Sequence, residues 1–272
     1  MQLSALRSTQ VPKVKALYAA VRGVLQRDGV AGVLRRVAEK AAEWREERES
    51  RLRDAFDAEF GTDTAGVVPL WKLNVEGPHR DQGVRYQATH PDSVRRHLAA
   101  LPIAFEQFAY VDLGSGKGRT LLVASEFPFR RVTGVEFSPE LHAIAEDNIG
   151  KWQSPRRRCS EVRSVCADAA AFALPDDDLV LFMYNPFGAE VMERVIQNLE
   201  RSLAARDRDV YVVYDNPLQR HVLDRCAFLK PIAARERAAV YVHEAAHRES
   251  VPAQSGVMVS ATQAETGRQR VG

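Results

Sequence analysis

The chain has 272 residues, of which 45% are hydrophobic and 27% are charged, which is ordinary globular usage and excludes wholesale disorder. Its three cysteines are too few and too irregularly spaced for a disulfide scaffold or a zinc site, and its net charge of +2 does not demand a nucleic-acid or membrane partner. No apolar run reaches the ~18 residues that a bilayer-spanning helix needs. We therefore expect a cytoplasmic protein without a transmembrane segment, and the composition leaves its oligomeric state open.

The first 60 residues have the apolar spacing of two helices, joined near Asp28-Gly29 and stopped at Gly61. We expect them to form a helical extension. Residues 1–40 carry eight Lys or Arg against two Asp or Glu, a net charge of +6. This basic part either covers the cleft of the following domain or binds RNA or a membrane. Residues 61–91 are rich in Gly, Pro and Asp, which predicts a connecting segment with one or two short strands.

From residue 92 onward, helical and strand-like segments alternate, beginning with a helix that we expect to start at Asp92-Ser93. This alternation predicts an α/β domain over residues 92–250, with a doubly wound, mainly parallel, seven-stranded sheet. Residues 251–272 have no periodicity, which predicts a disordered tail. The expected strands are 108–113, 131–137, one within 160–168, 178–185, 209–215, 228–233 and 238–244, and the expected helices are 117–127, 139–149, 188–204 and 218–226.

A glycine-rich loop follows the first of these strands. Gly114, Gly116 and Gly118 allow the backbone to turn sharply and to approach a ligand closely. Glu136 ends the next strand, where a carboxylate can accept hydrogen bonds from both ribose hydroxyls of a nucleoside. Together, the loop, its flanking elements and the acidic residue predict a nucleoside-binding site rather than a simple tight turn.

Two further positions narrow the choice of nucleoside. Arg119 stands where the third glycine of a dinucleotide-binding GxGxxG motif would be, and the P-loop pattern does not fit either. Asp112, just before the loop, would repel a phosphate chain but suits a ligand with a cationic amine. S-adenosylmethionine has such an amine, a ribose and no phosphate.

The segments VDLGSGKGR (111–119) and GVEFS (134–138) resemble motifs of the class I S-adenosylmethionine-dependent methyltransferases, and the similarity covers roughly residues 86–245. The resemblance implies a Rossmann-like methyltransferase fold with S-adenosylmethionine as cofactor. A closer resemblance, carried by Phe60-Gly61-Thr62-Asp63-Thr64 and GSGKGR, is to bacterial methyltransferase-domain proteins of unassigned substrate. The segment YQATHPD (86–92) resembles the region before motif I in non-SET lysine methyltransferases, in which a tyrosine contacts the cofactor, and this resemblance implies the same role for Tyr86. The cofactor-binding residues that the resemblances together imply are Tyr86, Asp112, Gly114, Ser115, Gly116, Lys117, Gly118, Glu136, Phe137, Asp168 and Asn185.

The fourth strand of the domain ends in Asn185-Pro186-Phe187-Gly188. This segment resembles the (D/N)PP(Y/F/W) motif of amino-directed methyltransferases, although its second proline is missing. The resemblance makes Asn185, Pro186 and Phe187 candidate catalytic residues. The alternative interpretation is a strand terminated by Asn-Pro before a helix.

We therefore expect a methyltransferase (EC 2.1.1) that methylates a nitrogen atom of a small molecule or of a protein. An RNA base is an alternative acceptor. A nicotinamide-dependent oxidoreductase, disfavoured by Asp112 and Arg119, and a non-catalytic cofactor-binding module are alternatives of other classes. No spacing of His, Cys and Asp in the sequence predicts a metal site.

Overall fold

The computed structural model describes residues 54–69, 73, 85–235 and 237–246, together with scattered positions between 29 and 38. Most of the expected helical extension and all of the expected tail (251–272) lie outside the described residues. No helix in the described segments has the length and apolar character needed to span a bilayer.

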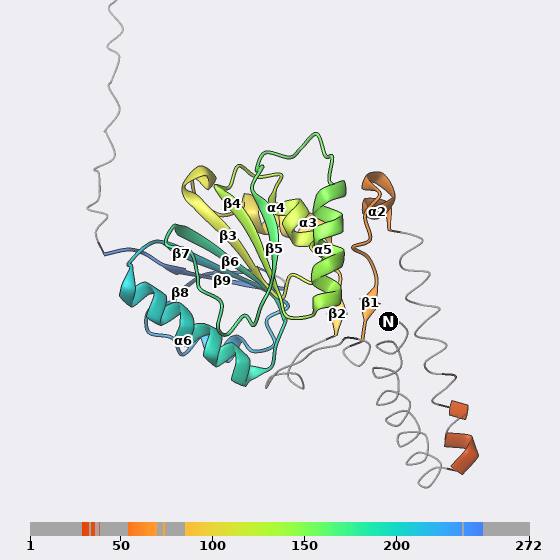
Figure 1. Cartoon of the computed structure of the whole chain (residues 1–272). Coiled ribbons are helices and arrows are strands. Elements are labelled where there is room, and N and C mark those ends of the chain that lie inside the picture. The colour runs from red at the N-terminus through yellow and green to blue at the C-terminus, as the bar shows by residue number, and fades with distance from the viewer. Residues whose placement is uncertain are drawn as a thin grey trace, which may run out of the picture.

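A seven-stranded sheet forms the centre of the domain, with helices on both faces (Figure 1). Its strand order is β5-β4-β3-β6-β7-β9-β8, and only β9 runs antiparallel to both of its neighbours. This strand order confirms the fold class predicted from the sequence. The strands are parallel because buried apolar segments that are connected by helices pair in this way. The strands are β3 (Phe108–Leu113), β4 (Arg131–Glu136), β5 (Val162–Cys166), β6 (Asp178–Tyr184), β7 (Val210–Asp215), β8 (Lys230–Arg235) and β9 (Ala238–His243).

Two layers of helices cover the sheet, and alternate residues of each strand point to opposite layers. Phe108 and Tyr110 of β3 belong to the core under α3 and α4, whereas Val111 and Leu113 belong to the core under α6. In Figure 1, α3, α4 and α5 lie on one side of the sheet and α6 on the other. The helices of the domain are α3 (Pro91–Ala99), the short 3-10 helix η4 (Phe105–Gln107), α4 (Arg119–Ala124), α5 (Pro139–Lys151), α6 (Ala189–Ala205) and α7 (Arg220–Leu223).

Local capping decides where α3 and α5 begin. Ser138 caps α5 by accepting a hydrogen bond from the backbone N–H of Leu141 at 3.3 Å, and Pro139 occupies the first turn. α3 begins at Pro91 because the side chain of His90 accepts from the backbone N–H of Asp92 at 3.2 Å. The predicted start at Asp92-Ser93 is therefore slightly late, since histidine is not among the preferred capping residues.

A short strap precedes the domain; we use this name for residues 54–69. It contains α2 (Ala55–Phe60) and β1 (Val67–Val68), and β1 pairs antiparallel with β2 (Tyr86–Gln87). Gly61 ends α2 in the left-handed conformation, as predicted from the sequence. The expected continuation of one helix up to Gly61 is wrong, because Asp54 has an extended backbone and caps α2 as a separate helix.

Candidate functional site

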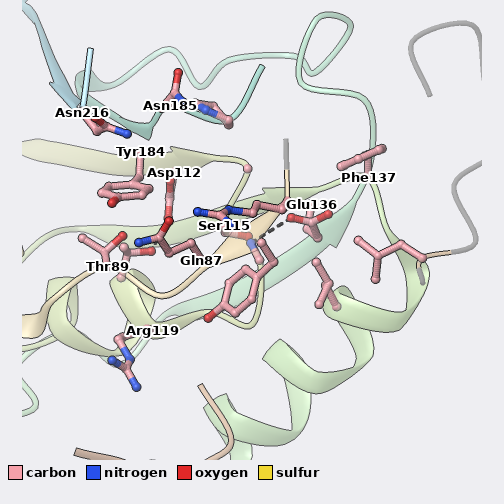
Figure 2. A pocket seen from close by; sticks show the side chains of 18 of the residues that line it. Gln87, Thr89, Asp112, Ser115, Arg119, Glu136, Phe137, Tyr184, Asn185 and Asn216 are labelled. Atoms are coloured by element: carbon pink, nitrogen blue, oxygen red, sulfur yellow. Dashed lines mark hydrogen bonds between the residues drawn. The ribbon is translucent and has the colours of Figure 1, made fainter. Parts of the chain in front are cut away.

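A cavity of about 300 Å³ opens at the carboxyl ends of the parallel strands, where the chain order of the sheet reverses between β3 and β6 (Figure 2). This is the edge at which open α/β sheets bind ligands. Most of the site residues predicted from the sequence lie in the wall of this cavity. The predicted site residues that line the cavity are Tyr86, Asp112, Gly114, Ser115, Gly116, Glu136, Phe137, Asn185 and Pro186. Lining residues that the sequence did not indicate include Gln87, Thr89, Arg119, Leu141, Tyr184 and Asn216.

The glycine loop is packed closely between two other site residues. Gly114 and Gly116 have φ angles of +84° and +56°, which L-residues rarely adopt. A Cβ atom on Gly114 would lie 2.5 Å from Cβ of Pro186, and one on Gly116 would lie 2.2 Å from Cε2 of Tyr86. The glycines are therefore required for contact with Pro186 and Tyr86, and not only for the approach of a ligand.

Glu136 is buried at the end of β4, with 2% of its surface exposed. Its Oε2 accepts a hydrogen bond from the backbone N–H of Gly116 at 2.8 Å (Figure 2). Its Oε1 accepts a hydrogen bond from the backbone N–H of Ser138, also at 2.8 Å. Burial raises the pKa of Glu136 to about 7, although these backbone hydrogen bonds act in the opposite direction. Each oxygen still has a lone pair that can accept from a ligand.

Asp112 is the second buried carboxylate of the cavity and is 2% exposed. It accepts a hydrogen bond from the hydroxyl of Thr120. Burial raises its pKa to about 7, and the nearby charge of Glu136 adds to the rise. Within the described part of the chain, neither Asp112 nor Glu136 forms an ion pair. The cavity therefore favours a ligand that supplies hydrogen-bond donors or positive charge.

Two asparagines end neighbouring strands in the same unusual conformation. Asn185 follows β6 with φ 39°, and Asn216 follows β7 with φ 51°; both line the cavity (Figure 2). The hydroxyl of Tyr214 donates to Oδ1 of Asn185 at 3.4 Å. Asparagine tolerates the left-handed region better than most residues, so the sequence allows a sharp turn here while keeping an amide at the cavity wall.

Three predicted site residues lie away from the cavity. Phe187 is 9% exposed and belongs to the hydrophobic core with Val191 of α6. Asp168 is exposed and accepts from the backbone N–H of Ala170 at 2.9 Å. Gly118 caps α4, and its α-carbon faces Ala145. None of these three residues lines the cavity, and their roles at the cofactor site stay predictions.

The side chain of Lys117 also points away from the cavity. It is fully buried, and its Nζ donates to Oδ1 of Asp63 at 2.9 Å and to the carbonyl of Ala65 at 3.0 Å. Asn148 of α5 joins the same contact, since its Nδ2 donates to the carbonyls of Asp63 and Lys117. The structure thus places Lys117 in the attachment of the strap to the glycine loop, and not in the cofactor cavity as the resemblance implied.

Arg119 makes the second attachment of the strap. Its Nε donates to Oγ1 of Thr64 at 2.7 Å, and its Nη2 lies 2.8 Å from Oδ2 of Asp54 and 3.5 Å from Oδ2 of Asp57. Asp57 is buried and accepts from the backbone N–H groups of Thr64 and Ala65. Burial acts to raise the pKa of Asp57, but hydrogen bonds from Thr64 and Thr62 outweigh it and lower the pKa.

These contacts join two short motifs that lie far apart in the sequence. The resemblance rested on both FGTDT (60–64) and GSGKGR (114–119), but the sequence did not show that they touch. The cationic side chains of the second motif bind the first, across more than 50 positions of the chain. The strap thereby supports Tyr86, whose hydroxyl donates to the carbonyl of Thr64 at 2.5 Å.

One family model matches part of the chain. Residues 111–206 match the family model described as a methyltransferase domain. No curated protein matches the chain. The chain is similar in structure to TrmN from Thermus thermophilus, with 18% identity and a TM-score of 0.41, over 57% of this chain and 48% of that one. It therefore spans about half the length of that protein.

The chain is also similar to two other solved structures. An RNA methyltransferase from Salinibacter ruber, in complex with S-adenosyl-L-homocysteine, has 21% identity and a TM-score of 0.41, over 60% of this chain and 95% of that one. The ribosomal protein L11 methylase from Lactobacillus delbrueckii subsp. bulgaricus has 16% identity and a TM-score of 0.38, over 57% and 77% of the two chains.

The family match runs from within β3 to the end of α6, and this segment carries the glycine loop, Glu136 and Asn185. The sheet around them has the order and the single reversed strand expected of a Rossmann-like methyltransferase. Residues 111–206 are therefore similar to a methyltransferase domain, and the matched segment includes the glycine loop, Glu136 and Asn185.

Proposed function

We propose that the cavity at β3, β4 and β6 holds S-adenosylmethionine and that the domain methylates an amine nitrogen placed beside Asn185. Glu136 accepts hydrogen bonds from the ribose hydroxyls, and Asp112 lies on the side of the methionine ammonium. The observation that carries this proposal is the pair of buried carboxylates, each with a pKa raised to about 7 and with no ion-pair partner among the described residues.

The cofactor fits this lining for electrostatic reasons. Burying carboxylates without a cation costs free energy, and a ligand that brings positive charge and hydroxyl donors recovers part of that cost. S-adenosylmethionine brings an ammonium, a sulfonium and two ribose hydroxyls. The pyrophosphate of a nicotinamide dinucleotide would instead place negative charge beside Asp112 and Glu136. The same lining therefore disfavours the oxidoreductase alternative.

When bound, S-adenosylmethionine supplies a methyl group on a sulfonium, and the electron pair of the broken S–CH3 bond stays on sulfur. The chain has to hold the acceptor nitrogen with its lone pair aimed at that methyl group, and alignment of this kind is worth roughly 7–11 kcal/mol in well-oriented systems. The nitrogen forms the new N–CH3 bond with its lone pair and releases its proton to water.

Asn185 suits the task of holding that nitrogen. Its amide oxygen accepts a hydrogen bond from the hydroxyl of Tyr214 at 3.4 Å, and its second lone pair can accept one from an N–H group of the acceptor. A neutral amide does not stabilise the protonated, unreactive form of an amine as a carboxylate would. Pro186 packs against Gly114 and joins this strand end to the glycine loop. Phe187 takes no part, because it lies in the core.

The experiment that tests this proposal uses the full chain with S-adenosylmethionine labelled in the methyl group. The protein and the labelled S-adenosylmethionine are incubated separately with small molecules, proteins and RNA extracted from cells. We expect label on a nitrogen atom of a small molecule or protein. Asn185→Ala should reduce turnover more than it reduces the affinity for S-adenosylhomocysteine, since the lost contact orients the acceptor. Label on oxygen or carbon, or equal loss of turnover and cofactor affinity, would contradict the role of Asn185.

A further inference from the structure

A second cavity, of about 660 Å³, lies beside the cofactor cavity. The two cavities share Gln87, Thr89 and Tyr184 in their walls. The second one extends away from the glycine loop, between α3, the ends of β6 and β7, and the turn between β8 and β9. Its size lies within the range of small-molecule sites. The charged and titratable side chains that line it are His90, Arg96, His97, Tyr184, Asp215 and Arg237.

Two arginines give this cavity a cationic side. Arg96 comes from α3 and Arg237 from the β8–β9 turn, so they reach the cavity from different elements. Nη2 of Arg96 donates to Oγ of Ser93 at 3.0 Å. Within the segments that the structure describes, neither guanidinium forms an ion pair with a carboxylate. A planar guanidinium offers paired N–H donors that match a carboxylate or a phosphate.

The carboxylate in the same cavity is already paired. Oδ2 of Asp215 lies 3.5 Å from Nε2 of His97, and these side chains are only 5% and 12% exposed. Asp215 is the register partner of Tyr184 across β6 and β7. Arg96 and Arg237 are exposed, whereas Asp215 is buried and His97 and Tyr184 are half-buried. The cavity therefore has an inner end with Asp215, His97 and Tyr184, and the two arginines lie nearer to solvent.

The inner end leads toward the reacting centre. Tyr184 lines both cavities, and the residue after it is Asn185, which lines the cofactor cavity. Asn216 follows Asp215 in the same way on β7. Burial raises the pKa of the Tyr184 phenol, and the charge of Asp215 adds to the rise, so the hydroxyl stays protonated at neutral pH. It can donate or accept a hydrogen bond where the cavities meet.

We propose that the second cavity binds the methyl acceptor, and that this acceptor is a small-molecule amine carrying an oxyanion, either a carboxylate or a phosphate monoester. Arg96 and Arg237 bind the oxyanion, while the amine end passes Tyr184 toward Asn185. This inference rests on the proposed function, which it narrows from amines in general to small anionic amines. Two arginines from separate elements and a cavity of small-molecule size favour this class over a polymer.

Binding of simple anions tests the arginines directly. Inorganic phosphate and acetate are titrated into the full chain, already saturated with S-adenosylhomocysteine, and binding is followed by calorimetry or by phosphorus NMR. We expect Arg96→Gln and Arg237→Gln each to weaken anion binding about tenfold, the scale of a hydrogen bond to a charged group. The anion that binds more tightly identifies the anionic group of the methyl acceptor, either phosphate or carboxylate. Equal binding by both variants and the wild type would overturn the inference.

A matched control is available on the far edge of the sheet. Arg156 is an exposed arginine in the loop before the amino end of β5, and Arg156→Gln should bind the anions as the wild type does. Affinity for S-adenosylhomocysteine should be unchanged in all three variants. If the wild type does not bind S-adenosylhomocysteine at all, the proposed function fails. If it binds S-adenosylhomocysteine but neither anion, only the present inference fails.

Acceptor screening gives a second, independent readout. Small amines with a carboxylate or phosphate group are compared with matched amides and esters that lack the charge. We expect methylation of the anionic members, with Arg96→Gln raising KM more than it lowers kcat, because the arginine binds the end remote from the reacting nitrogen. Equal methylation of the neutral analogues, or methylation confined to RNA or to protein, would overturn the inference.

Discussion

The ring of Tyr86 lies against the α-carbon of Gly116, so closely that a Cβ atom there would be 2.2 Å from Cε2. The hydroxyl at the other end of that ring donates to the carbonyl of Thr64 in the strap. Tyr86 therefore connects the strap with the loop that lines the cofactor cavity. Any change at this contact should affect both the stability of the strap and the binding of the cofactor.

Gly116→Ala should weaken S-adenosylhomocysteine binding and lower the unfolding temperature. The new Cβ would displace Tyr86, and the φ of +56° adds strain of about 1–2 kcal/mol for an L-residue. Gly61→Ala is the matched control, because Gly61 has φ +67° but no atom within 4 Å of an added Cβ. It should show the strain alone and leave cofactor affinity unchanged.

The steric part of the Gly116→Ala effect can be isolated with a double mutant. In a Tyr86→Ala background the clash is removed, so the added cost of Gly116→Ala should fall to that of Gly61→Ala. Denaturant unfolding of the four proteins in the cycle measures this coupling. Simple additivity of the two substitutions would show that the contact between Gly116 and Tyr86 is absent in solution.

Asp57→Asn should destabilise the protein by about 3 kcal/mol, the scale for removing one member of a buried charged network. Asp57 is buried and accepts from two backbone N–H groups and two hydroxyls, and Arg119 lies beside it. Glu59→Gln, at an exposed position of the same helix, is the control and should be neutral. Urea unfolding measures both. A neutral Asp57→Asn would mean that the strap contributes little to the fold.

The buried Glu136 should make the stability of the ligand-free protein depend on pH. Its pKa is about 7 in the folded state against an ordinary value of 4.5, so the folded state holds a proton that the unfolded state has lost between these pH values. The contribution of Glu136 to stability therefore decreases as pH rises from about 4.5 to about 7.

Glu136→Gln lacks this titration and serves as the comparison. The free energy of unfolding of the variant, relative to the wild type, should increase by up to about 3 kcal/mol between pH 4.5 and pH 8. The change with pH is the predicted quantity, because glutamine also alters the hydrogen bonds to Gly116 and Ser138. Parallel stability curves for the two proteins would contradict the raised pKa.

Asn185 can be tested with two substitutions that differ in backbone freedom. Both Asn185→Gly and Asn185→Ala remove the amide, so both should lower turnover about tenfold. Because φ is 39°, alanine is strained at this position and glycine is not. We therefore expect Asn185→Gly to be the more stable of the two in thermal unfolding, the reverse of the usual order. Full turnover by either variant would show that Asn185 only ends the strand and has no catalytic role.

The strands and most helices could be predicted because their signals are local. Phe108–Leu113 is a continuous apolar run, and the observed strand has the same bounds as the expected one. Glu136 and Asn185 were placed correctly at the cavity because strand ends in a parallel sheet meet at one edge. The start of α3 was misplaced because the cap came from a histidine, which carries little statistical signal.

Other features of the site depend on long-range contacts that no local pattern reveals. Lys117 and Arg119 lie within the glycine motif, but their partners are in the strap, more than 50 residues earlier. Phe187 follows the pattern of an amino-directed methyltransferase, but its ring fills the core beneath α6. The arginines of the second cavity come from α3 and the β8–β9 turn, which only the folded sheet brings together.

The most direct test of the central claim is a calorimetric titration of S-adenosylhomocysteine into the full chain and into Glu136→Ala. We predict one molecule bound per chain, and an affinity reduced in the variant by about 1.5–3 kcal/mol, the scale of a hydrogen bond to a charged group. Equal affinity in the two proteins would show that Glu136 does not contact the bound ligand. No binding by the wild type would contradict the assignment of the cavity to S-adenosylmethionine.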